Sequence, residues 1–136
     1  MKEKQILILL RVSLGLVFFW FGLLKVFGAS PVYVLVTTSY SFLPEPKTFF
    51  LLGIYEVVVG FLVMTGIFFR YAIVLYLLQL LTTFLAVFLA IPMFFKNGNL
   101  LLLTLEGEFV IKNFVLFFAA LFLAIRAFKH NSTKEK

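Results

Sequence analysis

Four long runs of apolar residues, separated by short polar stretches, organise the chain. They cover about residues 6–28, 49–69, 71–95 and 106–128. Each run can cross the hydrocarbon core of a bilayer as a helix, which takes about 20 apolar residues. Residues 29–47 form an interfacial loop, helical or extended, and residues 129–136 form a polar tail. The pattern predicts a single transmembrane domain over residues 1–136.

Each apolar run carries one stripe of small or polar residues at helical spacing. The stripes of the first three runs contain Arg11, Gly15, Phe18, Gly22 and Lys25; Gly53, Glu56 and Gly60; and Gln79, Thr82, Thr83, Ala86 and Ala90. Side chains three and four positions apart share a helix face, and small residues let membrane helices approach closely. We therefore expect an all-α, antiparallel four-helix bundle with its polar groups inside. Gly15, Gly22, Gly53 and Gly60 are the expected helix-packing residues.

Composition supports an integral membrane protein. The chain is 63% apolar and 13% charged, against about 25% charged residues in a soluble domain. Cysteine is absent and a single histidine lies in the tail, so the sequence predicts no metal site and no cofactor held covalently or by metal ligation. The basic residues lie at the ends of the runs, which indicates membrane orientation and argues against nucleic-acid binding.

The distribution of cations predicts the orientation. Four spans place both termini on one side of the membrane. That side holds eight cations, Lys2, Lys4, Arg11, Arg70, Arg126, Lys129, Lys134 and Lys136, and the other side holds Lys25, Lys47, Lys96 and Lys112. Because positive charge is enriched in cytoplasmic segments, we expect both termini in the cytoplasm.

Glu56 is the one ionisable residue inside the second run. An acid at the centre of a membrane helix costs roughly 2.5–3.5 kcal/mol on insertion scales, so we expect it to face the protein interior. Helical side chains lean toward the N-terminus of their own helix, and in antiparallel helices Lys25 and Glu56 therefore lean toward each other. We expect a contact between them, direct or through water. Glu108 and Lys112, an i, i+4 pair in the last run, can rim the same cavity.

Three interpretations of this cluster remain open. An ion pair can fix the register of the helices and have no chemistry. The charged side chains can also simply reach from the helix ends to water, without forming a common site. Alternatively, Lys25, Glu56, Glu108 and Lys112 form a ligand, quinone or proton site, because ionisable residues within a membrane are usually functional.

Three groups of residues resemble the DoxX-like family of membrane proteins. They are Arg11-x-x-Leu14-Gly15 with Gly22-x-x-Lys25; Gly53-x-x-Glu56-x-x-x-Gly60 with Gly66 and Arg70; and the stretch LEGEFVIKN at residues 105–113. The resemblance implies a four-span protein of the bacterial inner membrane. Some relatives are described as subunits of quinone-linked oxidoreductases, and others as membrane partners in oxidative-stress complexes.

Three functions follow as hypotheses. The first is an accessory or quinone-facing subunit of a membrane oxidoreductase, with a protein partner that carries the redox centre. The second is a small proton-coupled transporter that uses Glu56, although pairing with Lys25 or Lys112 disfavours proton exchange. The third is a structural or assembly partner without chemistry. A homo-oligomer is compatible with each of them.

Overall fold

The computed structural model describes residues 2–42, 46–99 and 101–132, with the backbone alone for residues 130–132. The long helices are α1 (Glu3–Val26), α3 (Lys47–Thr65), α4 (Phe69–Leu89) and α6 (Leu105–Ser132). The short helices are α2 (Tyr33–Ser39), α5 (Ile91–Phe94) and the 3-10 helix η1 (Lys96–Gly98). The predicted all-α class is confirmed over the described part of the chain, where the one β-type contact is an isolated bridge between Phe95 and Leu103.

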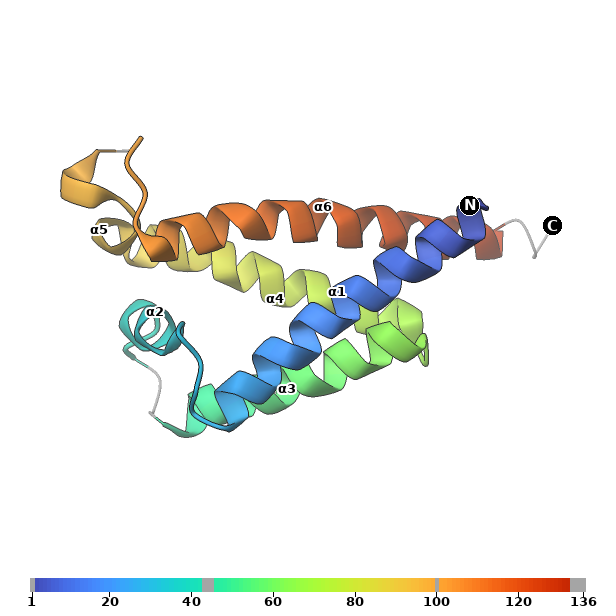
Figure 1. The fold of residues 1–136 in the computed structure, drawn as a ribbon, viewed down its shortest axis with the longest axis horizontal. Coiled ribbons are helices and arrows are strands. Elements are labelled where there is room, and N and C mark those ends of the chain that lie inside the picture. Colours follow the sequence, from blue (N-terminus) through green and yellow to red (C-terminus); the bar gives the residue numbers. More distant parts are fainter. Residues whose placement is uncertain (1, 43–45, 100, 133–136) are drawn as a thin grey trace.

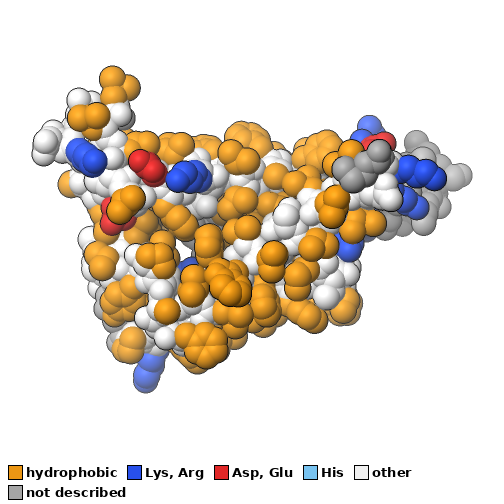
Figure 2. All heavy atoms as spheres, viewed as in Figure 1, with side chains coloured by type: hydrophobic (Ala, Val, Ile, Leu, Met, Phe, Trp, Pro, Cys, Tyr) orange, Lys and Arg blue, Asp and Glu red, His pale blue; other side chains and the backbone are white. Residues whose placement is uncertain are grey.

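The four long helices have the length and composition of membrane spans. The shortest, α3, has 19 residues and reaches roughly 28 Å at 1.5 Å per residue, close to the thickness of a hydrocarbon core. Most large apolar side chains on the outer faces are exposed, and Figure 2 shows them over the middle of the face, with Lys and Arg gathered at the two ends. These are the features of a multi-pass membrane protein.

The long helices form two antiparallel pairs. Helix α1 crosses α3, and α4 runs beside α6 (Figure 1). The pairs lie closest together where α1 begins and α6 ends, and they separate at the opposite end, where α2 lies between them. Residues 29–42 therefore include a helix, which is one of the two conformations that the sequence left open.

The core lies where the two pairs converge. Tyr76 of α4 is fully buried there, and its ring stacks on Phe18 of α1 with the centroids 3.6 Å apart. Its hydroxyl donates to the Leu14 carbonyl at 3.3 Å, so the buried phenol has a polar partner. This contact joins the first pair of helices to the second.

Helices α1 and α3 meet through the backbone at two places. A Cβ added at Gly15 would lie 2.6 Å from the Gly60 carbonyl oxygen, and one added at Gly22 would lie 2.7 Å from that of Gly53. Real Cβ atoms essentially never come this close to a backbone atom. The structure thus brings all four glycines singled out in the sequence into one contact, as packing through small residues requires.

Three helix ends lie four or more residues from those expected. The second helix ends at Thr65 and not at residue 69, because Gly66 adopts a left-handed conformation with φ 82°, and α4 already begins at Phe69. The third helix ends at Leu89 and not at residue 95, because Pro92 lacks a backbone N–H and its ring would collide with the carbonyl four residues earlier. Ala90 leaves the helical conformation, with φ −142° and ψ 49°, and α5 begins at Ile91 with the proline in its first turn. The polar tail is not separate from the last helix at residue 129, since α6 continues to Ser132.

Candidate functional site

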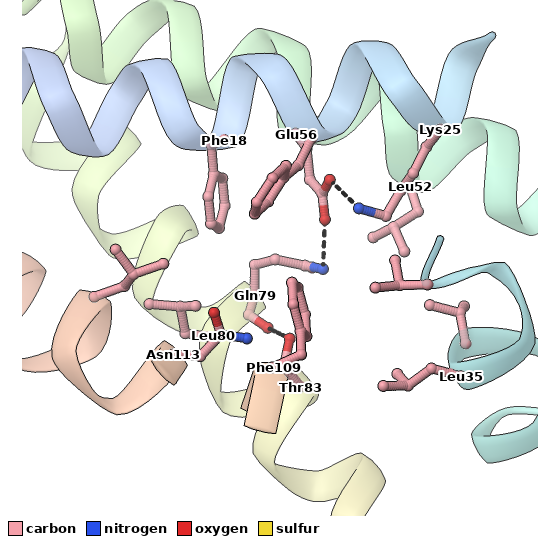
Figure 3. A pocket seen from close by; sticks show the side chains of 14 residues that line it. Phe18, Lys25, Leu35, Leu52, Glu56, Gln79, Leu80, Thr83, Phe109 and Asn113 are labelled. Carbon is pink, nitrogen blue, oxygen red and sulfur yellow. Dashed lines mark hydrogen bonds and ion pairs between the residues drawn. The ribbon is translucent and has the colours of Figure 1, made fainter. Parts of the chain in front are cut away.

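Lys25 and Glu56 form a buried ion pair between α1 and α3. The Lys25 Nζ lies 2.6 Å from Glu56 Oε2, and the two side chains are 5% and 8% exposed. The contact expected from the sequence is therefore present and direct (Figure 3). Burial strips water from both charges, so each ion is tolerated only because the other is beside it.

The glycine contact between the helices positions this ion pair. A Cβ at Gly53 would lie 2.8 Å from the Cβ of Lys25. Position 53 therefore has to be glycine for Lys25 to pack directly against the backbone of α3. Glu56 follows Gly53 by three residues and lies on the same helix face. The backbone approach at Gly22 and Gly53 therefore sets the register in which ammonium and carboxylate meet.

Helix α4 supplies a second donor to the carboxylate. The Gln79 Nε2 donates to Glu56 Oε1 at 3.3 Å, so each oxygen of Glu56 accepts one hydrogen bond. The Thr83 hydroxyl, one turn further along α4, donates to the Gln79 backbone carbonyl at 3.1 Å. Both α4 residues belong to the polar stripe predicted for the third run, although they were not included among the candidate site residues.

A small cavity of about 50 Å³ lies beside the ion pair. It has room for a few water-sized groups, since about 10–15 Å³ of such volume holds one water. Polar side chains from all four long helices line it: Lys25, Glu56, Gln79, Thr83 and Asn113. Its other walls are apolar and include Leu35 of α2.

Asn113 of α6 is the polar group of the cavity that lacks a partner. The residue is 5% exposed, and its side chain lines the cavity together with Gln79 (Figure 3). No group among the described residues hydrogen-bonds its amide. Because the amide borders the cavity, a polar group within the cavity can be its partner, and an amide that is fully desolvated without one would cost about 1–3 kcal/mol.

Two larger hollows adjoin the cavity. One of about 250 Å³ lies between α2, α3 and α4 and shares Leu52, Gln79 and Thr83 with the cavity. Tyr40 at its rim donates to the Thr82 carbonyl at 2.5 Å and ties α2 to α4. The other, of about 670 Å³, lies at the outer ends of α1 and α3 and shares Lys25 with the cavity. The outer hollow therefore reaches Lys25 itself, and the other hollow reaches the Gln79 and Thr83 side of the cavity.

The structure does not bring Glu108 and Lys112 to this site. They pair with each other at 3.7 Å, and their side chains are 55% and 78% exposed. Neither lines the cavity or the two hollows beside it. Charged side chains near a helix end remain in water more cheaply than in the core, so this pair lies on the outer face of α6.

The buried face of α6 differs from the face that its charges suggest. The buried residues are small or apolar apart from Asn113: Gly107, Val110, Asn113, Ala120, Leu123 and Ala124. The seven-residue spacing of Asn113 and Ala120, with Gly107 near the start of the helix, is the signal that identifies this face. Small residues mark membrane helix contacts more reliably than charges at the end of a span.

The described residues contain no group of three His, Asp or Glu side chains that could hold a metal ion. The side chain of His130 and the cations Lys134 and Lys136 lie outside the described part of the chain. What the site offers is hydrogen bonding and proton exchange. Lys25 and Gln79 donate, Glu56 accepts, and the Asn113 amide can do either.

No family model, curated protein or solved structure matches this chain.

Proposed function

We propose that the chain is an accessory, quinone-facing subunit of a membrane oxidoreductase, and that its cavity binds the polar head of the quinone. The observation that carries the proposal is the convergence of polar side chains from four helices on a cavity beside an apolar hollow. A quinone presents carbonyl oxygens on a flat apolar ring, so it needs hydrogen-bond donors at one end of its site and apolar walls around the rest.

The hydrogen-bond inventory suits a carbonyl oxygen. The Lys25 ammonium has three donors, and one is directed to Glu56. The Asn113 amide, which also lines the cavity, offers further donors. A carbonyl edge fits the space of about 50 Å³, and the hollow of about 250 Å³ next to it accommodates the ring.

The chemistry assigned to this chain is proton transfer. Reduction of a quinone to a quinol consumes electrons and protons in equal number. The redox centre of a protein partner supplies the electrons and becomes oxidised. The Lys25 ammonium, held by the Glu56 carboxylate that Gln79 also orients, passes a proton to the reduced oxygen, and that proton is replaced from the aqueous side through the hollow that Lys25 lines.

The proposed location is the bacterial inner membrane with both termini in the cytoplasm. Among the described cations, the end of the bundle where α1 begins and α6 ends carries Lys2, Lys4, Arg11, Arg70, Arg126 and Lys129. This asymmetry fits the enrichment of positive charge on the cytoplasmic side. The resemblance to DoxX-like proteins supports the same location and the same link to quinones.

A thermal-shift experiment tests the quinone site. Purified protein in detergent is melted with and without decylubiquinone, a short-tailed quinone. We expect the quinone to raise the melting temperature of the wild type and to have no effect on Glu56→Gln. Glu108→Gln removes the same charge from the exposed face and should keep the full shift.

Two results would count against the proposal: no quinone-dependent shift in the wild type, or an equal shift in wild type and Glu56→Gln. A pull-down of the tagged protein from its native membrane tests the redox partner separately. Recovery of a flavin-, haem- or iron–sulfur-containing protein supports the accessory role, and recovery of the chain alone contradicts it.

A further inference from the structure

Arg70 is held in a fixed position at the end of the bundle opposite the cavity. It lies in the first turn of α4, and its Nη2 donates to the Ala127 carbonyl of α6 at 3.1 Å. Its guanidinium carbon lies 5.5 Å from the centroid of the Phe128 ring, a cation–π arrangement. These two contacts fix the guanidinium between α4 and α6, and most of its five N–H donors remain available.

An apolar groove leads away from this guanidinium. The groove has a volume of about 440 Å³ and is lined by Arg70, Tyr71, Val74, Leu75 and Phe128. Apart from the guanidinium and the Tyr71 hydroxyl, these side chains are apolar. Val74 and Leu75 come one turn after Arg70 on α4, so the apolar wall lies nearer the middle of the span than the charge does.

The positive charge at this end is not balanced within the described part of the chain. Among the described residues, Glu3 is the carboxylate at this end, and it forms an ion pair with Arg126. Neither Arg70 nor the neighbouring Arg11, whose guanidinium lies 5.9 Å from the Phe69 ring, has a carboxylate within ion-pair distance among the described residues. An anion is therefore the missing complement.

We propose that this groove binds an anionic phospholipid, with its phosphate on Arg70 and an acyl chain along Val74, Leu75 and Phe128. A guanidinium can hold two phosphate oxygens at once, and basic pockets between membrane helices on the cytoplasmic side suit anionic head groups. The site is separate from the cavity at Lys25 and Glu56 and does not depend on the quinone proposal.

Native mass spectrometry of the delipidated full-length protein tests this site. The probes are phosphatidylglycerol, zwitterionic phosphatidylcholine with the same acyl chains, and inorganic phosphate. We expect the wild type to bind phosphatidylglycerol more tightly than phosphatidylcholine. Arg70→Gln should weaken phosphatidylglycerol binding about fivefold, the effect of one basic residue near a membrane surface. Lys96→Gln removes one charge at the opposite end and should leave the affinity unchanged.

A second variant separates the groove from the charge and covers the case in which Arg70→Gln does not fold. Val74→Trp fills the groove from an exposed position and keeps Arg70, so it should also weaken phosphatidylglycerol binding. Equal binding of the two lipids by the wild type would overturn the proposal, as would equal losses in Arg70→Gln and Lys96→Gln. Displacement of the lipid by millimolar inorganic phosphate would overturn the lipid assignment and indicate a free-phosphate site.

Discussion

The two helix pairs of this protein are held together in different ways. Helices α1 and α3 touch through glycine backbones at Gly15–Gly60 and Gly22–Gly53. Helices α4 and α6 touch through side chains, some of them aromatic, and the Phe84 ring stacks on Phe114 with the centroids 4.4 Å apart. Backbone contact fixes the register of α1 and α3 tightly enough for an ion pair of 2.6 Å. Large side chains separate helices, and on this side of the bundle the buried amide of Asn113 is left without a partner.

The largest expected effect comes from breaking the ion pair within the glycine-packed half. Lys25→Met leaves the Glu56 carboxylate buried without its ammonium, and we expect the free energy of unfolding to fall by about 3–5 kcal/mol. Replacing both residues, Lys25→Met with Glu56→Met, should restore most of that loss because no charge remains buried. Thermal and SDS-induced unfolding in detergent micelles measure both variants. Equal losses in the single and the double variant would show that the pair is not coupled.

The next effect tests the backbone contact itself. Gly60→Ala places a methyl group against the Gly15 carbonyl oxygen, which forces α1 and α3 apart, so we expect a loss of about 1–3 kcal/mol. Val58→Ile adds one methylene on the exposed face of the same helix and should change stability by less than about 0.5 kcal/mol. The same unfolding assay compares them. A tolerated alanine at position 60 would show that α1 and α3 leave room for a methyl group at this contact.

On the aromatic half, Asn113→Leu should change stability in the opposite direction. It replaces an unpartnered buried amide by an apolar side chain of similar size, so we expect the free energy of unfolding to rise by about 1 kcal/mol. The same variant should lose the decylubiquinone-dependent thermal shift. If Asn113→Leu is more stable but no longer shows the quinone-dependent shift, Asn113 serves ligand binding at the expense of stability. A destabilised variant that retains the full shift would assign Asn113 a purely structural role.

The smallest effect concerns α2, which covers the end where the two halves separate. Tyr40→Phe removes the hydrogen bond from α2 to the Thr82 carbonyl, and we expect a loss of about 0.5–1.5 kcal/mol. Burial raises the pKa of the Tyr40 hydroxyl above its usual value, so the donor should persist through mildly alkaline pH. Faster hydrogen exchange of the α2 amides in Tyr40→Phe is the measurement. Unchanged exchange would show that α2 is held by its apolar contacts alone.

The sequence was most informative where a structural feature depends on spacing along a single helix. Apolar runs of sufficient length predicted the four long helices, because the cost of burying backbone in lipid leaves helices as the available solution for such segments. The spacing of glycines predicted which faces of α1 and α3 meet. The direction in which helical side chains lean predicted that Lys25 would reach Glu56, and that contact is present.

The sequence was less informative where a feature depends on how separate helices are placed. Glu108 and Lys112 were predicted to line the cavity, but they lie on an exposed face of α6. The sequence spacing of a charge pair does not distinguish a pair in water from a pair in a cavity. Asn113, the residue that does line the cavity, carries no charge and lies beside Lys112 in the chain. The cavity exists because the two helix pairs separate toward one end. The angle between the pairs cannot be deduced from the residue pattern of any one helix.

The pairing of the helices also has a consequence for biosynthesis. Each helix of a tightly joined pair is the next long segment to leave the ribosome after its partner, so α1 and α3 can associate before α4 has been made. Lys25 and Glu56 then meet within the first hairpin. The nascent chain can thus deliver both charges to the bilayer as a neutral unit, and the second hairpin closes around a polar centre that is already assembled.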